Sequence, residues 1–405
     1  MDARKKPPKK PKTNPISSAI SSWLSALPPP LLDLITPAPD SNQNHIDLLL
    51  LTSPKRWVIY EPMVLLPSGS FTSLPWPALL SSLTPNQTSL LWAAILRNIS
   101  PSSKVPLTHL AINEGIPLHT IATTTTSNEE GEGEENLLRS PSGLRPLHGS
   151  FGPTTPFASD RDFSTAFWVS TKQNGITQIW APRWTMFSRG NVKEKARLLS
   201  FHDAARPGGP GVKGKWAVDL YAGIGYFVFS YARLGMRVLC WELNPWSVEG
   251  LRRGAEANGW SVRAVMGEEL ELSMGELVGG GEQIVVLLED NREAGRRVRA
   301  LRGVREVEVA HVNCGFLPSS EGSWRDAWEI QGKGLRDGGK GWLHLHENVG
   351  FGDIEERRGE INVMLNEWGG GEVKGEVEHV ELVKTFAPDV WHCVFDVCIT
   401  KSGPA

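Results

Sequence analysis

The spacing of apolar residues becomes regular after residue 215, where short apolar runs alternate with amphipathic stretches. The runs predict buried strands at 216–220, 237–241, 284–288, 307–312, 341–345 and 391–399. Helices are predicted at 227–234 and 246–258, and in the second one Val248, Leu251 and Ala255 share one face. Strands that alternate with helices predict an α/β fold with a mostly parallel, doubly wound sheet.

The pattern before residue 200 is less regular and predicts a smaller α/β domain. Residues 57–66 are rich in aromatic and β-branched residues, which favours a strand, and residues 76–82 and 89–98 favour helices. We therefore expect an N-terminal α/β domain at 16–200 and a Rossmann-like catalytic domain at 201–405.

Two biased segments lie outside this pattern. Residues 1–15 combine lysines and one arginine with prolines and predict a disordered basic tail. Residues 123–136 contain five glutamates and predict an exposed acidic insertion in a loop of the N-terminal domain. The sequence does not indicate what either segment does.

Composition excludes several classes of protein. The chain has 42 Lys and Arg against 45 Asp and Glu, so its net charge of −3 excludes a uniformly basic nucleic-acid binder but leaves local basic patches open. No apolar run reaches the roughly 18 residues of a membrane-spanning helix, and the N-terminus lacks the apolar region of a signal peptide. The four cysteines form no C-x-x-C pair, so we expect reduced thiols in a cytoplasmic protein without a metal site.

The candidate chemistry begins where the first regular strand ends, at Asp219-Leu-Tyr-Ala-Gly223-Ile-Gly225. Two glycines after a strand let the backbone approach a ligand closely. Glu242 ends the next strand, where an acid can accept the ribose hydroxyls of an adenine nucleoside. A dinucleotide site expects a third glycine where this chain has Val228, so the spacing favours S-adenosylmethionine (AdoMet) over NAD or FAD; a tight turn that binds no ligand is the other alternative.

Longer motifs carry a family resemblance. The stretch from Glu242-Leu-Asn-Pro-Trp to Asn258-Gly-Trp260 resembles a tRNA-modifying group that joins guanosine-37 N1-methyltransferases to the aminocarboxypropyltransferases of the wybutosine pathway. The chain is more similar to the latter. Segments 167–176, 180–197 and 312–324 agree, and the resemblance covers roughly residues 145–405.

The resemblance implies a reaction. It is the transfer of the 3-amino-3-carboxypropyl group of AdoMet to C7 of 4-demethylwyosine, a tricyclic guanosine derivative at position 37 of tRNA(Phe), with methylthioadenosine as the other product. Matching positions imply AdoMet contacts by Ser188, Lys195, Glu242, Asp290 and Asn291. The partner is then the anticodon loop of tRNA(Phe), and we expect a monomer.

Structural roles compete with each of these assignments. Ser188 suits a helix N-cap, and Lys195 suits a solvated helix face, as does Arg197. Asp290 and Asn291 suit a capped strand-to-helix turn, and Asp219 an orienting role in the glycine loop.

The tRNA is expected to meet a basic segment at 183–197, in which Arg183 and Arg189 are candidate substrate-binding residues. Trp184, Trp246 and Trp324 are candidates either for stacking on the tricyclic base or for core packing. No residue in the sequence is a defensible general base, so no catalytic residue is assigned.

Two departures from the family pattern affect the prediction. Residues 261–282 resemble an insertion ahead of the strand at 284–288, which weakens the assignment of Asp290 and Asn291. Where enzymes that methylate amino groups carry Asn-Pro-Pro-aromatic, this chain has Asn313-Cys-Gly-Phe, which argues against methylation of an exocyclic amine and leaves Asn313 as a candidate substrate-binding residue. A guanosine-37 N1-methyltransferase and a non-catalytic tRNA-binding protein with a relic AdoMet fold remain the alternatives.

Overall fold

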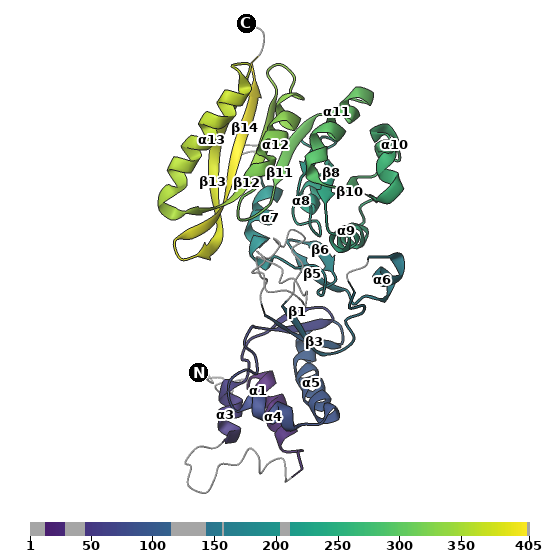
Figure 1. Cartoon of the computed structure of the whole chain (residues 1–405), viewed down its shortest axis with the longest axis vertical. Coiled ribbons are helices and arrows are strands. Elements are labelled where there is room, and N and C mark those ends of the chain that lie inside the picture. Colours follow the sequence, from purple (N-terminus) through teal and green to yellow (C-terminus); the bar gives the residue numbers. More distant parts are fainter. Residues whose placement is uncertain (1–12, 29–44, 115–142, 156–157, 203–210, 403–405) are drawn as a thin grey trace, which may run out of the picture. The chain divides into compact units, whose positions relative to one another are not determined.

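The computed structural model describes residues 13–28, 45–114, 143–155, 158–202 and 211–402 (Figure 1). The chain forms two compact units. The first comprises residues 1–155 and 165–170, and the second comprises residues 156–164 and 171–405. The predicted acidic insertion at 123–136 and residues 1–12 of the predicted tail lie outside the described residues.

The first unit is a four-stranded sheet packed against helices. Its strands lie in the order β1-β2-β3-β4, with β2 and β3 parallel. The strands are β1 (Val58–Tyr60), β2 (Met63–Leu66), β3 (His109–Asn113) and β4 (Leu144–His148). The helices are α1 (Pro15–Leu24), α3 (His45–Thr52), α4 (Trp76–Ser82) and α5 (Pro85–Ile99), followed by the 3₁₀ turn η1 (Ser100–Ser102). Helix α1 begins inside the predicted tail because the Asn14 side chain caps its first turn.

An eight-stranded sheet organises the second unit, in the order β13-β14-β12-β11-β7-β8-β10-β9. The pairs from β12 to β9 are parallel, and β14 is antiparallel to both β12 and β13. The strands are β7 (Trp216–Asp219), β8 (Arg237–Glu242), β9 (Val262–Val265), β10 (Ile284–Leu288), β11 (Val309–Cys314), β12 (Lys340–Gly350), β13 (Val373–Ala387) and β14 (Val390–Lys401). The predicted fold class, a Rossmann-like α/β sheet, is confirmed.

Helices cover both faces of this sheet. One face packs on α10 (Met274–Gly279), α11 (Ala294–Val304), α12 (Trp324–Gly332) and α13 (Ile354–Gly369). The other face packs on α7 (Val192–Leu199), α8 (Val228–Arg233) and α9 (Pro245–Ala257). Successive strand residues alternate between the two cores, so Val218 faces the first and Ala217 the second.

Shorter elements connect the units and the sheet. Helix α6 (Asp160–Thr165) and the hairpin of β5 (Val169–Gln173) with β6 (Ile176–Trp180) precede α7, and β6 packs on α9. The single-turn 3₁₀ elements of the second unit are η2 (Arg189–Asn191), η3 (Gly267–Glu271), η4 (Asn291–Glu293), η5 (Glu321–Ser323) and η6 (Phe351–Asp353).

The structure also differs from the sequence-based expectation in the domain boundary and in the apparent insertion. Residues 171–200 group with the second unit, whereas we expected the N-terminal domain to extend to residue 200. The apparent insertion at 261–282 forms β9 and α10 at one edge of the sheet. Because β9 lies outside β10, the insertion leaves β10 directly beside β8, and Leu288 remains level with Glu242.

Candidate functional site

The glycine loop after β7 folds over the end of β8. Gly223 and Gly225 have φ of 53° and 89°, a left-handed conformation that side chains disfavour. Glu242 holds the loop, because its carboxylate accepts a hydrogen bond from the Gly223 amide at 2.7 Å and another from the Asn244 amide at 2.8 Å. A carboxylate has about four lone pairs, so Glu242 can still accept a hydrogen bond from a hydroxyl of a ligand. Burial raises the pKa of Glu242.

Asp219 lies beneath this loop and is fully buried. One carboxylate oxygen accepts from the Tyr221 amide at 3.1 Å and from the Asn313 side-chain amide at 3.2 Å. Burial raises the pKa of Asp219 to about 7, even though both hydrogen bonds favour the charged form. These contacts fit the role of Asp219 in orienting the glycine loop. The Asn313 amide is directed at Asp219, and Asn313 is itself fully buried.

Asp290 and Asn291 follow β10. Asp290 caps η4 by accepting from the Arg292 amide at 2.9 Å, and an ion pair with the Arg292 side chain lowers the pKa of Asp290. Asn291 donates to the Leu220 carbonyl at 2.9 Å, which ties this turn to the start of the glycine loop. The two residues thus lie next to the loop, at the end of a third strand. Asp290 also has the capping role expected as the alternative.

Lys195 is buried in helix α7, with 4% of its surface exposed. Its ammonium donates to the side-chain oxygens of Gln173 at 2.9 Å and Gln178 at 2.6 Å, and burial lowers its pKa to about 7. The ammonium lies 5.0 Å from the centre of the Phe187 ring and 5.5 Å from that of Tyr226. No ion pair is found for Lys195 among the described residues, so its environment suits an anionic group supplied by a ligand.

Tyr226 links Lys195 and Ser188 to the glycine loop. It directly follows the loop, donates to the Met186 carbonyl and accepts from the Ser188 amide at 3.2 Å. The Ser188 hydroxyl is 3.5 Å from the ammonium of Lys384 on β13, and the side chain of Ser188 makes no capping bond to η2. Sequence reasoning missed Tyr226 and Lys384, because neither stands in a motif with fixed spacing.

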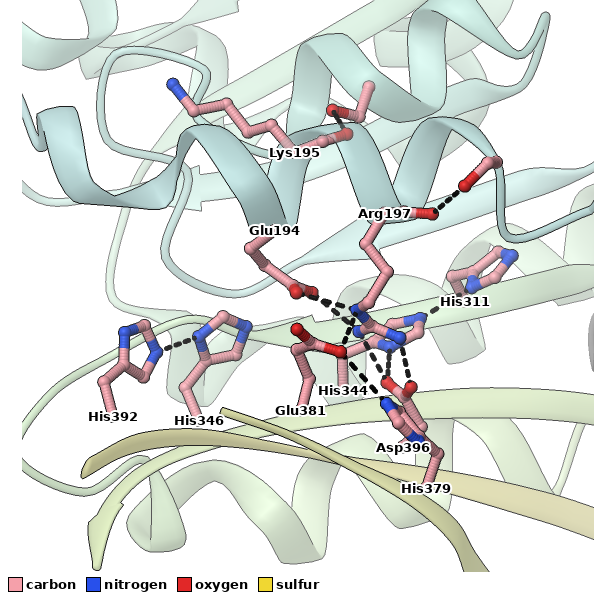
Figure 2. A network of polar contacts seen from close by, with 12 residues as sticks. Glu194, Lys195, Arg197, His311, His344, His346, His379, Glu381, His392 and Asp396 are labelled. Carbon is pink, nitrogen blue, oxygen red and sulfur yellow. Dashed lines mark hydrogen bonds and ion pairs between the residues drawn. The ribbon is translucent and has the colours of Figure 1, made fainter. Parts of the chain in front are cut away.

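The predicted basic surface at 183–197 is smaller than expected. Arg197 points inward, where it pairs with Glu194 and with Asp396 of β14, and only 10% of its side chain is exposed (Figure 2). The alternative of a solvated helix face is therefore wrong for Lys195 and Arg197. Arg189 and Lys193 are exposed.

Arg183 is half-buried, and its Nε atom has no partner among the described residues.

Two of the three tryptophans considered for base stacking are core residues. Trp324 is fully buried and donates to the Ser320 hydroxyl at 2.8 Å, and Trp246 is 3% exposed. Trp184 is half-buried and stacks on Trp246, with ring centres 5.4 Å apart. Core packing therefore accounts for Trp246 and Trp324.

The arrangement suits an adenine nucleoside that carries an amino-acid group. The Glu242 carboxylate, the Asn291 turn and the buried Lys195 ammonium surround one glycine loop, with lone pairs for hydroxyls and a cation for a carboxylate. The residues present thus fit AdoMet. In the described part of the chain, no group of three or more His, Cys, Asp or Glu side chains is placed to hold a metal ion.

Comparison with known proteins places the chain in a family, although no family model matches it. A protein of Schizosaccharomyces pombe, tRNA wybutosine-synthesizing protein 2, is 39% identical over 347 residues, which cover 85% of this chain and 72% of that protein. Its namesake in Saccharomyces cerevisiae is 33% identical, over 86% of this chain and 75% of that protein. The chain belongs to the tRNA wybutosine-synthesizing protein 2 family.

Solved structures agree on the fold of this wybutosine-synthesizing family member. The crystal structure of TYW2 from Pyrococcus horikoshii in complex with MeSAdo is 18% identical, with a TM-score of 0.55 over 95% of this chain and 100% of that chain. Trm5b from Pyrococcus abyssi is 16% identical, with a TM-score of 0.52 over 90% of this chain and 81% of that chain.

Proposed function

We propose that the protein transfers the 3-amino-3-carboxypropyl group of AdoMet to C7 of 4-demethylwyosine at position 37 of tRNA(Phe). The observation that carries the proposal is the Asp219–Gly225 loop closed on Glu242 in a member of the tRNA wybutosine-synthesizing protein 2 family. The solved TYW2 of Pyrococcus horikoshii holds MeSAdo, the product left when AdoMet loses this group.

The side chains around the loop divide the binding task. Glu242 accepts the ribose hydroxyls, and the turn at Asp290 and Asn291 borders the adenine. Lys195 holds the methionine carboxylate, and Ser188, which Tyr226 links to Lys195, contributes its hydroxyl. The sulfonium of AdoMet activates three carbons, so the product depends on which carbon is held in line with the nucleophile. A carboxylate fixed by Lys195 holds the chain that carries the γ-carbon.

The fold alone also suits a guanosine-37 N1-methyltransferase, since Trm5b from Pyrococcus abyssi shares it. The match to the tRNA wybutosine-synthesizing protein 2 family favours aminocarboxypropyl transfer over methylation at N1. Methylation of an exocyclic amine is a separate alternative, and against it stands Asn313, whose amide is occupied by Asp219 inside the sheet. An intact glycine loop argues against a relic fold that only binds tRNA.

The finer parts of the proposal concern the partner and the setting. We infer that the anticodon loop of tRNA(Phe) is the region bound, with Arg183 and Arg189 as contacts, because Arg183 precedes η2 and Arg189 begins it, in the segment that leads into α7. We also infer that the protein acts as a monomer in the cytoplasm. Its four cysteines are unpaired and buried, which fits a reducing compartment. No helix among the described residues is long and apolar enough to cross a membrane.

The test uses AdoMet labelled in its carboxyl carbon, incubated with tRNA(Phe) that carries 4-demethylwyosine. Label in the RNA together with free methylthioadenosine is the expected result. Label that stays in adenosylhomocysteine would identify a methyltransferase, and the absence of turnover despite tRNA binding would favour the binding protein. Unmodified tRNA(Phe) serves as the control substrate and should remain unlabelled.

A further inference from the structure

A group of buried polar atoms near the ends of β12 and β14 has no partner among the described residues. These atoms are Nε2 of His346, Nδ1 of His392 and both side-chain polar atoms of Asn348. Both histidines are 1% exposed. Because a buried polar atom without a hydrogen bond costs free energy, such a group calls for an explanation. A ligand with several donors and acceptors would satisfy it.

The two histidines form a pair that can pass a proton. Nδ1 of His346 lies 2.9 Å from Nε2 of His392, and Figure 2 shows this bond apart from the network around Arg197. Burial lowers the pKa of His346 and brings that of His392 to about 4, so both rings are neutral at neutral pH. If His346 donates this bond, its Nε2 carries a free lone pair and His392 carries a proton on Nδ1.

The pair borders the candidate AdoMet site on two sides. The His346 ring lies 5.0 Å from the ring of Phe227, which lies two residues after the glycine loop. His392 stands opposite Lys384 in the β13–β14 register, and the Lys384 ammonium reaches the Ser188 hydroxyl. Asn348 stands opposite His392 in the β12–β14 register. A base bound against these residues would therefore lie next to the cofactor residues.

We propose that His346 is the general base of the transfer, that His392 is a positioning residue that takes over the proton, and that Asn348 binds the edge of the tricyclic base. This assignment rests on the proposed function. It supplies the proton acceptor that the sequence did not reveal.

C7 of the base forms a bond to the γ-carbon as the bond between that carbon and sulfur breaks, and its electron pair leaves with methylthioadenosine. The adduct is a cation, so its C7 proton is acidic enough for a neutral imidazole. That proton passes to Nε2 of His346, and the Nδ1 proton of His346 passes to Nε2 of His392, which holds the positive charge until the products leave.

The experiment compares His346→Gln with wild type in single-turnover transfer of the carboxyl label. We expect the rate to fall about 100-fold or more, as for loss of a general base, while the Kd values for AdoMet and tRNA stay within about twofold. Deuterium at C7 of the substrate base should slow His346→Gln more than wild type, because loss of the C7 proton becomes the slow step. A structural role would not produce this isotope effect.

His311→Gln is the matched control. His311 is also a buried histidine paired with a histidine, but its partner is His344, in a separate hydrogen-bond network. It should keep the wild-type rate. If His346→Gln does not fold, His392→Gln carries the test, and it should show a slower rate and a larger isotope effect at unchanged Kd. A wild-type rate in the folded variant, or a loss confined to Kd, overturns the inference while wild-type labelling of the tRNA leaves the proposed function standing. Absence of labelling by wild type would instead overturn the proposed function.

Discussion

The surroundings of the buried Lys195 side chain link its protonation to the binding of a ligand. Its ammonium is held by two glutamine oxygens and two aromatic rings, with its pKa lowered to about 7. A carboxylate placed beside it would stabilise the charged form and raise that pKa again. Binding of a ligand with a carboxylate must then be linked to protonation.

This linkage gives a prediction for calorimetry. At pH 8 Lys195 is mostly neutral in the free protein, so binding of AdoMet should take up close to one proton, whereas at pH 6 the lysine is already charged and uptake should approach zero. Titrations in buffers of different ionisation enthalpy measure the uptake. Lys195→Gln should lose both the uptake and much of the affinity. Uptake that persists in that variant would assign the proton to another group.

Between strands β7 and β8, the glycine loop depends on backbone shape. A Cβ atom at Gly225 would lie 2.5 Å from the Phe229 ring, at a φ that side chains rarely adopt. Gly225→Ala should therefore weaken AdoMet binding at least tenfold. It should also lower the free energy of unfolding by about 1–2 kcal/mol.

The control for this substitution is Gly303→Ala in helix α11. No atom lies within 4 Å of a Cβ at Gly303, so alanine should stabilise the helix slightly and leave AdoMet affinity unchanged. Equal affinity for AdoMet in the two variants would mean that the glycine loop is not part of the AdoMet site.

Helix α7 is joined to strand β14 by buried charges. Arg197 donates to both oxygens of Glu194, at 2.8 and 2.7 Å, and to Asp396, which in turn bonds His344 at 2.7 Å. Arg197→Met should destabilise the second unit by about 3–5 kcal/mol, because two carboxylates would stay buried without their cation. Chemical denaturation measures this loss.

Arg252 on helix α9 provides the comparison. It also pairs with two glutamates, but 35% of its side chain is exposed. Arg252→Met should cost at most about 1 kcal/mol. Similar losses in both variants would mean that burial of the Arg197 network has no energetic consequence.

At the scale of the whole molecule, a net charge of −3 means that tRNA must be attracted by local cations. Arg189 is exposed beside Ser188 and begins η2. Arg189→Ala should lower tRNA affinity several-fold, make its salt dependence shallower and leave AdoMet affinity unchanged. Filter binding at several salt concentrations tests this.

Arg299, exposed on helix α11, is the control for Arg189, and Arg299→Ala should bind tRNA as wild type does. If Arg189→Ala weakens AdoMet and tRNA binding equally, Arg189 contributes to the cofactor site rather than to an RNA surface.

The sequence predicted the parts of the molecule that depend on local order. The βα repeats, the glycine loop and the position of Glu242 follow from period and spacing. The inward turn of Arg197 did not follow, because its partner Asp396 is 199 positions away and a charged helix residue is usually solvated. The His346–His392 pair was missed for a similar reason. Alternating polar residues at 344, 346 and 348 in a buried strand were the available signal.

The separation of Arg197 from Asp396 also bears on synthesis of the chain. Translation delivers Glu194 and Arg197 long before strand β14 exists, so the growing chain must carry this helix without its second carboxylate. The second unit can complete its sheet only after residue 396 has left the ribosome, since β14 lies between β12 and β13. Until then a nascent chain exposes the long edge of β12, a surface on which chaperones would be expected to act.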